Sequence, residues 1–201
     1  MTRLKKWPSL ILFSIAVLSA STSPASKNVE KFCFDMKEGI PSWPKKMTIE
    51  PGNTGRLNEG LFAGIAQIIT PKEAGKHLNE KKWIFIDNRI QQDRAPGVVP
   101  RALLMTVESL QPKEEEMSAQ HLIASLNSMS KADKEKLGLK DKYTDVTEMS
   151  DLNFVTYCNG RQCHRAPMGA CKLRKMGFTE KQVHLLVEGF PGWQEAGLPV
   201  K

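Results

Sequence analysis

Short apolar runs alternate along the chain with segments whose apolar residues have helical spacing. The runs "WIFID" at 83–87, "LNFVTYC" at 152–158 and "VHLLV" at 183–187 have the length and composition of strands buried on both faces. A fourth run, "ALLMTV" at 102–107, predicts another strand of the same kind. A parallel sheet in the core is therefore expected.

The segments between these runs carry the start and stop signals of helices. Thr70, Pro71 and Glu73 form a capping box with proline in the first turn, which predicts a short helix to about residue 78. Other helical signals are the apolar positions at 122, 123, 126 and 129, the cap residues at 130, 133 and 138, and the apolar face at 166, 170, 173 and 176. Strands alternating with helices predict an α/β domain with a mostly parallel sheet.

The first residues have the pattern of a signal peptide rather than of a folded element. Three basic residues precede the apolar run at 10–18, and small residues follow. Cleavage after Ala25 fits, which gives a signal peptide at 1–25, while a cut after Ala20 or an uncleaved anchor stays open. We expect an exported, periplasmic protein whose mature form is not in the membrane. Residues 26–66, rich in Pro, Gly and Lys, are expected to be an N-terminal extension before a domain at 67–201.

The net charge of the chain argues against nucleic acid as a partner. The formal net charge is +7, and removing the predicted signal peptide, which has three basic and no acidic residues, lowers it to +4. This mild positive balance does not indicate nucleic-acid binding, but it favours small anions near a site.

If the protein is exported, its cysteines can form disulfides, because oxidising compartments permit these bonds. The four cysteines are Cys33, Cys158, Cys163 and Cys171, and four thiols allow three complete pairings. Cys33, between two phenylalanines, is expected to hold the extension on the domain, and Cys171 is expected to pack beside the apolar helix face. A Cys33–Cys171 bond is compatible with the sequence, but no pattern singles it out.

The stretch "YCNGRQCHRAP" at 157–167 leads from a predicted strand into a predicted helix. Such a loop gathers backbone N–H groups, and the helix dipole adds positive potential. Arg161 and Arg165 add two permanent charges, and Gly160 permits a tight turn. We therefore expect Cys158 to be an ionised nucleophile beneath a small anionic substrate. The structural alternative is a buried thiol that packs like a small hydrophobic residue.

In chain order, "IDNR" at 86–89, "GVVPRA" at 97–102, "YC" with its loop, and "VEGFPGWQEAGLPV" at 187–200 resemble the landmarks of a rhodanese-like domain. The resemblance covers about residues 67–201 and implies a single three-layer α/β module. It implies sulfur transfer through a Cys158 persulfide, from a small anionic donor such as thiosulfate to a thiol or protein acceptor, with no cofactor. The substrate-binding residues would be those of the loop: Asn159, Gly160, Arg161, Gln162, Cys163, His164 and Arg165.

The sequence departs from the family pattern at several positions. Val98 stands where the family usually has histidine, and Arg101 and Phe190 each stand where it has glycine. The loop from Cys158 to Arg165 has eight residues, whereas active sulfurtransferases of the family commonly have about six and related phosphatases about seven. A phosphatase is therefore less favoured than a sulfurtransferase, because the loop lacks the seven-residue spacing and no histidine precedes Cys158.

The longer loop contains Cys163, which opens a second mechanism. Cys158 and Cys163 could cycle between dithiol and disulfide, with Cys163 resolving an adduct on Cys158. The alternative function is thus a thiol-redox or non-catalytic module that binds a partner. Haem attachment through Cys163-His164 does not suit a loop beside a buried strand, and the histidine and cysteine spacing predicts no zinc site.

Asp87 and Arg89 lie at the carboxyl end of a predicted strand, which is the ligand side of an α/β sheet. Asp87 is expected either to order the thiol loop, through its amides or Arg165, or to form a structural salt bridge at the same edge. The sequence leaves both supporting roles open.

Overall fold

The computed structural model describes residues 33, 62, 64–107, 116–161 and 163–201. The predicted signal peptide, nearly all of the predicted extension and Gln162 lie outside these residues, so the proposed domain limits stay predictions. No helix in the described ranges is long and apolar enough to cross a membrane.

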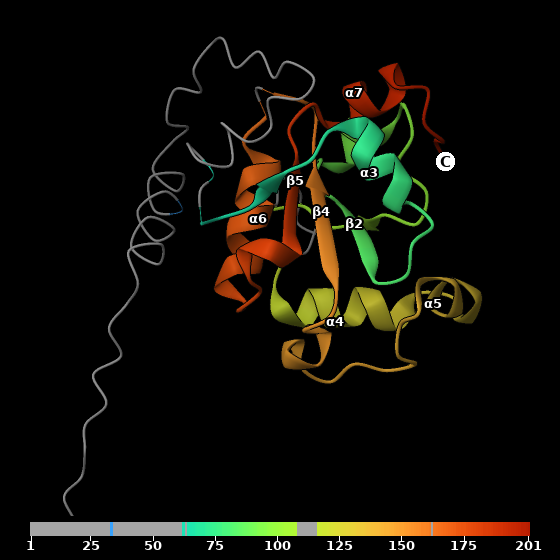
Figure 1. The fold of residues 1–201 in the computed structure, drawn as a ribbon, viewed down its shortest axis with the longest axis vertical. Helices are drawn as coiled ribbons and strands as arrows, with labels where there is room; N and C mark the ends of the chain where they lie inside the picture. Colours follow the sequence, from blue (N-terminus) through green and yellow to red (C-terminus); the bar gives the residue numbers. More distant parts are fainter. Residues whose placement is uncertain (1–32, 34–61, 63, 108–115, 162) are drawn as a thin grey trace, which may run out of the picture.

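A five-stranded sheet forms the centre of the fold, in the order β1-β5-β4-β2-β3 (Figure 1). Its strands are β1 (Gln67–Ile68), β2 (Trp83–Asp87), β3 (Leu103–Leu104), β4 (Asn153–Tyr157) and β5 (Val183–Leu186). Every neighbouring pair is parallel. The carboxyl ends of β4, β2 and β5 therefore meet at one edge, where ligands bind in open parallel sheets.

Alternate residues of the central strands enter two separate hydrophobic cores. In β4, Phe154 packs into one cluster, whereas Val155 and Tyr157 pack into the other. In β2, Ile84 and Phe85 divide in the same way. This alternation confirms the prediction from the apolar runs, because a parallel strand covered on both faces has no polar side.

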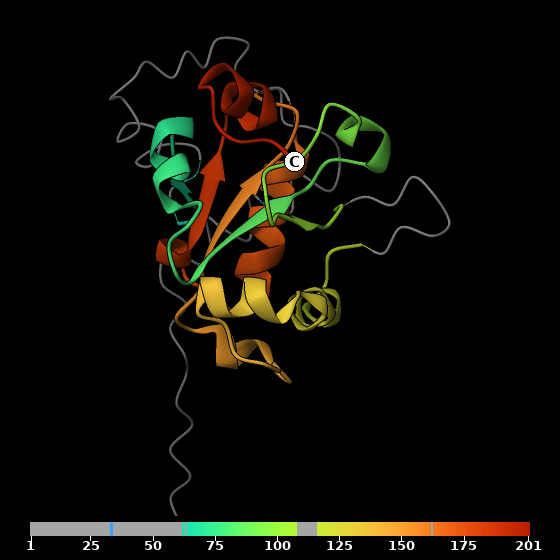
Figure 2. The same ribbon diagram turned by 90° about the vertical axis from the view of Figure 1, so that its right-hand side faces the viewer.

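Helices cover both faces of the sheet, so the molecule has three layers (Figure 2). The cluster on one face includes residues of α4 (Ala119–Ser128), α5 (Lys131–Leu137) and α6 (Arg165–Lys175). The other cluster includes residues of α3 (Pro71–His77) and α7 (Gly189–Glu195). Short 3-10 helices lie at η1 (Gln91–Arg94), η2 (Val146–Met149) and η3 (Glu180–Gln182). The predicted α/β fold class is confirmed.

The predicted helix caps are also present. The side chain of Thr70 accepts a hydrogen bond from the backbone of Glu73, and the Glu73 carboxylate accepts one from the backbone of Thr70. Ser130 caps α5, and Gly138 ends it in the left-handed conformation at φ 62°. Among the strands and α-helices that the structure describes, β1 and α7 were not predicted: β1 is only two residues long, and α7 contains two glycines and a proline.

Cys33 and Cys171 form a disulfide, with an S–S distance of 2.00 Å and a Cα–Cα distance of 5.7 Å. The bond joins a residue of the predicted extension to α6, the helix that follows the thiol loop. This is one of the pairings that the sequence left open. Cys171, which was expected only to pack beside the helix face, therefore forms a covalent bond to the predicted extension. Cys158 and Cys163 remain free thiols.

Candidate functional site

The thiol loop leaves β4 at Tyr157 and enters α6 at Arg165, at the carboxyl edge of the sheet. Its turn is closed by a hydrogen bond from the Cys163 N–H to the Gly160 carbonyl at 3.0 Å. The Cys158 carbonyl accepts the N–H of Phe190 at 2.8 Å, which fastens the start of the loop to α7. The two thiols are thus held between the end of a strand and the start of a helix, as the sequence predicted.

Two glycines make this close packing feasible. Gly160 has a φ of 109°, a conformation that residues with a side chain rarely adopt. Gly189 has a φ of 60°, and a Cβ atom there would lie 2.3 Å from the Cys158 carbonyl oxygen. The tight turn expected at Gly160 is confirmed, and Gly189 explains how α7 reaches the loop.

Cys158 is buried, with 1% of its surface exposed. Burial raises the pKa of its thiol well above the ordinary value, and the hydrogen bond that it donates to the Cys163 side chain acts in the same direction. The Cys158 thiol donates a hydrogen bond to the Cys163 carbonyl oxygen at 3.3 Å. The core that surrounds Cys158 disfavours its charged form, and the assignment of Cys158 as the ionised nucleophile stays a prediction.

Cys163 has the opposite environment and is only partly buried. The hydrogen bond from the Cys158 thiol lowers the pKa of Cys163 to about 6, against the effect of burial. The backbone N–H groups of Asn159 and Arg165 and the charge of Arg165 lower it further. The cradle of amides predicted for the loop therefore serves both sulfur atoms: the N–H groups of Gly160 and Ala166 lower the pKa of Cys158, and those of Asn159 and Arg165 lower the pKa of Cys163.

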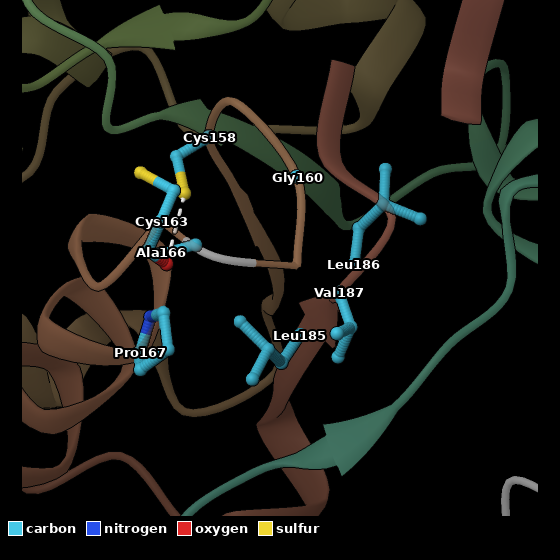
Figure 3. Close-up of a pocket in the computed structure, with 8 residues that line it drawn as sticks. All are labelled: Cys158, Gly160, Cys163, Ala166, Pro167, Leu185, Leu186 and Val187. Atoms are coloured by element: carbon cyan, nitrogen blue, oxygen red, sulfur yellow. Dashed lines mark hydrogen bonds between the residues drawn. The ribbon is translucent and has the colours of Figure 1, made fainter. Parts of the chain in front are cut away.

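A small hollow lies beside the two sulfur atoms; it is partly open to solvent and has no room for a water molecule in this structure. Its remaining walls are largely apolar (Figure 3): Ala166 and Pro167 begin α6, and Leu185, Leu186 and Val187 end β5. Figure 3 shows the two sulfur atoms close together at one side of this hollow.

Carboxylates from outside the loop bind both of its arginines. Asp93 of η1 accepts hydrogen bonds from Arg165 Nη1 at 3.1 Å and from Asn159 Nδ2 at 2.5 Å. Glu188 lies 3.6 Å from Arg161 Nη2. Neither carboxylate was predicted from the sequence, although each follows the carboxyl end of a strand, where charged residues near a ligand site are expected.

Asp87 and Arg89 form the structural salt bridge rather than a contact with the loop. Arg89 Nη2 lies 2.7 Å from Asp87 Oδ2, and the two side chains are 1% and 0% exposed. Tyr157 donates from its hydroxyl to the same carboxylate at 3.0 Å, and Arg89 also donates to the carbonyls of Asp93 and Gly97. The pair thus supports the site indirectly, since it fixes the chain segment that carries Asp93.

His164 is the residue immediately before α6, and its side chain makes no capping hydrogen bond to the helix. Gln162, the other predicted binding residue, lies outside the described part of the chain. Among the described residues, no three His, Cys, Asp or Glu side chains gather in a group that could hold a metal ion.

Comparison with known proteins bears on the fold and the family. One similar structure is a protein of unknown function from Rhodopseudomonas palustris, described as a possible tyrosine phosphatase. It is 19% identical, with a TM-score of 0.42, over 81% of this chain and 100% of that one. A second, from Bacillus halodurans, is 16% identical, with a TM-score of 0.44, over 76% of this chain and 86% of that one.

The curated proteins compared with this sequence gave no match. A family model, described as "Rhodanese-like domain", matches residues 70–196. This range includes the sheet from β2 to β5, the thiol loop and both carboxylates that bind it. The chain therefore belongs to the family of rhodanese-like domains.

Proposed function

We propose that this domain is a sulfurtransferase that carries sulfane sulfur as a persulfide on Cys163, with Cys158 as its buried hydrogen-bond partner. The observation that carries the proposal is the contrast between two neighbouring free thiols. Cys163 is partly exposed, whereas Cys158 is buried with 1% of its surface exposed. A thiolate is the nucleophile in such chemistry, so the stabilised and accessible sulfur is the one that attacks.

The transfer requires two steps. The Cys163 thiolate attacks the outer sulfur of a donor, the bond between that sulfur and the rest of the donor breaks, and the remainder leaves with the bonding electrons. A thiolate acceptor then attacks the terminal sulfur of the persulfide, and Cys163 returns to its thiolate form. The loop amides of Asn159 and Arg165 stabilise the anion before and after each step, which is the role of an oxyanion-type cradle.

Intact-mass measurement of the full-length protein tests the proposal. With its loop thiols reduced, the protein is incubated with a sulfane-sulfur donor, and a gain of one sulfur atom is expected. The gain should be lost in Cys163→Ser and retained in Cys158→Ser, since the serine hydroxyl still donates a hydrogen bond. Loss in Cys158→Ser with retention in Cys163→Ser would restore Cys158 as the sulfur carrier. Absence of a gain with every donor would refute the function.

A thiol-redox module is the second candidate, because the two loop thiols are both free and their sulfur atoms lie close together (Figure 3). In this alternative, a mild oxidant removes two hydrogen atoms and a Cys158–Cys163 disulfide forms. Oxidation without any sulfur uptake, reversed by a dithiol reductant and abolished in either serine variant, would favour the redox module.

We also propose that the protein works in an oxidising, extracytoplasmic compartment. Support comes from the disulfide between Cys33 and Cys171, since such bonds persist where thiols are not kept reduced. Fractionation of cells that produce the full-length chain tests this proposal. Recovery of the protein with the cytoplasmic fraction, with Cys33 and Cys171 reduced, would contradict it.

A further inference from the structure

Two histidines and a tryptophan form a cluster near the amino ends of the strands, where none of them takes part in the thiol chemistry. His77, at the end of α3, stacks on Trp83 of β2, with ring centroids 3.6 Å apart and ring planes 8° apart. Trp83 also contacts His184 of β5, at a centroid distance of 4.6 Å and a tilt of 34°. The three rings therefore connect α3 with two strands of the sheet.

His184 is the buried member of this cluster. It is 8% exposed, and its Nε2 atom is buried without a hydrogen-bond partner among the residues that the structure describes. In a protonated imidazole both ring nitrogens carry hydrogen, so Nε2 of a charged His184 would be a buried donor without an acceptor. Such a charge is costly, because neither water nor a protein group replaces its hydration. The closed structure therefore requires the neutral ring.

The described groups around His184 oppose a positive charge on it. Its register partners are Gln67 in β1 and Val155 in β4, which are both uncharged. The charged group that acts on His184 is His77 of α3, whose Nδ1 lies 2.5 Å from the Glu80 carboxylate. Burial, and after it the charge of His77, lowers the pKa of His184 to about 4.

The remaining charged groups on these elements do not compensate His184. Lys82, just before β2, is paired with Asp151 at 3.1 Å, and Asp87 at the opposite end of β2 is paired with Arg89. The other charged residues of α3 are exposed: Lys72, Glu73 and Lys76. A proton on His184 therefore gains no counterion from the elements that surround the ring.

The helix α3 connects this cluster with the thiol loop. It lies beside α7 (Figure 1), and a Cβ atom at Gly192 of α7 would lie 3.3 Å from Pro71 Cγ of α3. The helix α7 in turn holds the loop, since the Phe190 N–H donates to the Cys158 carbonyl at 2.8 Å. The strand β1, directly before α3, pairs with β5 over only two residues. The edge formed by β1 and α3 is thus the thinly paired part of the sheet, and it bears on the loop through α7.

We propose that His184 is an acid sensor: when its ring gains a proton, the edge formed by β1 and α3 separates from the sheet, the ring reaches water, and α7 releases the thiol loop. Histidine suits this role because small changes in its surroundings move its titration across the mildly acidic range. The sensor works whichever chemistry the two thiols perform, so it does not rest on the sulfurtransferase function.

The direction of the pH effect follows from proton binding. In the unfolded chain His184 takes up a proton near the ordinary pKa of 6.5, whereas the folded ring does so only near 4. Between these two values unfolding binds one additional proton, so the equilibrium constant for unfolding rises about tenfold for each unit by which the pH falls. The contribution of His184 to stability is complete above 6.5 and is lost by the time the pH has reached about 4.

Urea unfolding of the full-length protein under non-reducing conditions tests this linkage. Between about pH 6.5 and about pH 4.5, the unfolding constant of the wild type should rise about a hundredfold more than that of His184→Gln, whose side chain takes up no proton. The matched control is His121→Gln, which removes a histidine of α4 outside the cluster and should keep the wild-type rise. Equal rises in the wild type and His184→Gln would overturn the proposal.

Hydrogen exchange, normalised to the intrinsic rate at each pH, locates the opening. In the wild type, acid should lower the protection of β1, α3 and the thiol loop while α4 and α5 stay protected, and His184→Gln should lose less protection. Equal loss in α4 and α5 would overturn the release of this edge. Titration of the His184 ring by NMR in the wild type needs no variant: a midpoint near 4 is expected, and one near 6.5 would overturn the sensor.

Discussion

Two sulfur atoms in one turn have different surroundings: burial raises the pKa of Cys158, whereas hydrogen bonds lower the pKa of Cys163. Cys158 continues β4 into the core, whereas Cys163 lies nearer the start of α6 and receives N–H groups from both sides of the turn. The buried thiol keeps its proton and donates it as a hydrogen bond, which favours the anion on its neighbour. The reactivity of the Cys163 thiol thus depends on Cys158 as well as on its own surroundings.

The first prediction concerns the pH dependence of alkylation at Cys163. Its thiolate should predominate above a midpoint of about 6 and disappear below it, so the rate of reaction with iodoacetamide should fall as the pH drops through this value. In Cys158→Ala the donated hydrogen bond is lost, and the midpoint should rise toward the ordinary 9.0. Cys158→Ser is the matched control, because a hydroxyl still donates. A midpoint that is the same in Cys158→Ala as in the wild type would show that Cys158 does not stabilise the anion.

Sequence could predict the loop but not the distribution of charge within it. The position of a cysteine between a strand and a helix predicts that backbone amides gather around a thiol, yet the burial of each cysteine depends on the direction in which β4 ends. Asp93 was missed for a related reason. It lies 66 residues from Asn159 along the chain, in a short 3-10 turn, and only the parallel pairing of β2 with β4 brings the two together.

At the level of elements, the end of β2 contains a fully buried ion pair. Arg89 bonds Asp87 through Nε and Nη2, and its guanidinium carbon lies 4.0 Å over the Phe190 ring of α7. Every charge in this cluster has a partner, which is the condition under which a buried pair is tolerated. The pair therefore connects β2, the η1 segment and α7 behind the thiol loop.

Replacing Asp87 by Asn should leave the Arg89 charge buried without its counterion. We expect a loss of about 3–5 kcal/mol in the free energy of unfolding, measured by urea denaturation. The matched control is Asp151→Asn, which breaks the exposed ion pair with Lys82 at 3.1 Å and should cost under about 1 kcal/mol. Equal losses in the two variants would contradict the role assigned to the buried pair.

The elements themselves were predicted where local signals were strong. The runs of β2, β4 and β5 and the caps of α3 and α5 were confirmed, because burial on both faces and side-chain capping are encoded within a few residues. The helix α7 was not predicted, since Gly189, Pro191 and Gly192 argue against a helix. Contact with the loop explains Gly189, where a side chain would collide with Cys158.

For the whole molecule, the disulfide between Cys33 and Cys171 links segments 138 residues apart. A bond that closes so long a loop restricts the unfolded chain, so it stabilises the native state by about 2–4 kcal/mol in typical cases. The sequence could not select this pairing, because neither cysteine has a local signal for its partner. Only the placement of residue 33 against α6 decides it.

The Cys33→Ser/Cys171→Ser variant should therefore unfold at lower urea concentration than the wild type under non-reducing conditions. Adding a strong reductant should lower the wild-type midpoint to that of the variant and leave the variant unchanged. Sulfur loading at Cys163 should survive in the variant where it remains folded, since neither substituted residue belongs to the loop. A wild-type midpoint that does not respond to reductant would count against the bond.

The most direct test of the account is to locate the sulfur atom after one turnover. Trypsin cleaves after Arg161, so Cys158 falls in the peptide 143–161 and Cys163 in the peptide 162–165. The wild-type protein is loaded with an alkyl persulfide, alkylated and digested, and both peptides are analysed by mass spectrometry. We expect the additional sulfur on the peptide 162–165. Finding it on the peptide 143–161 instead would show that the buried cysteine is the carrier and that the assignment of Cys163 is wrong.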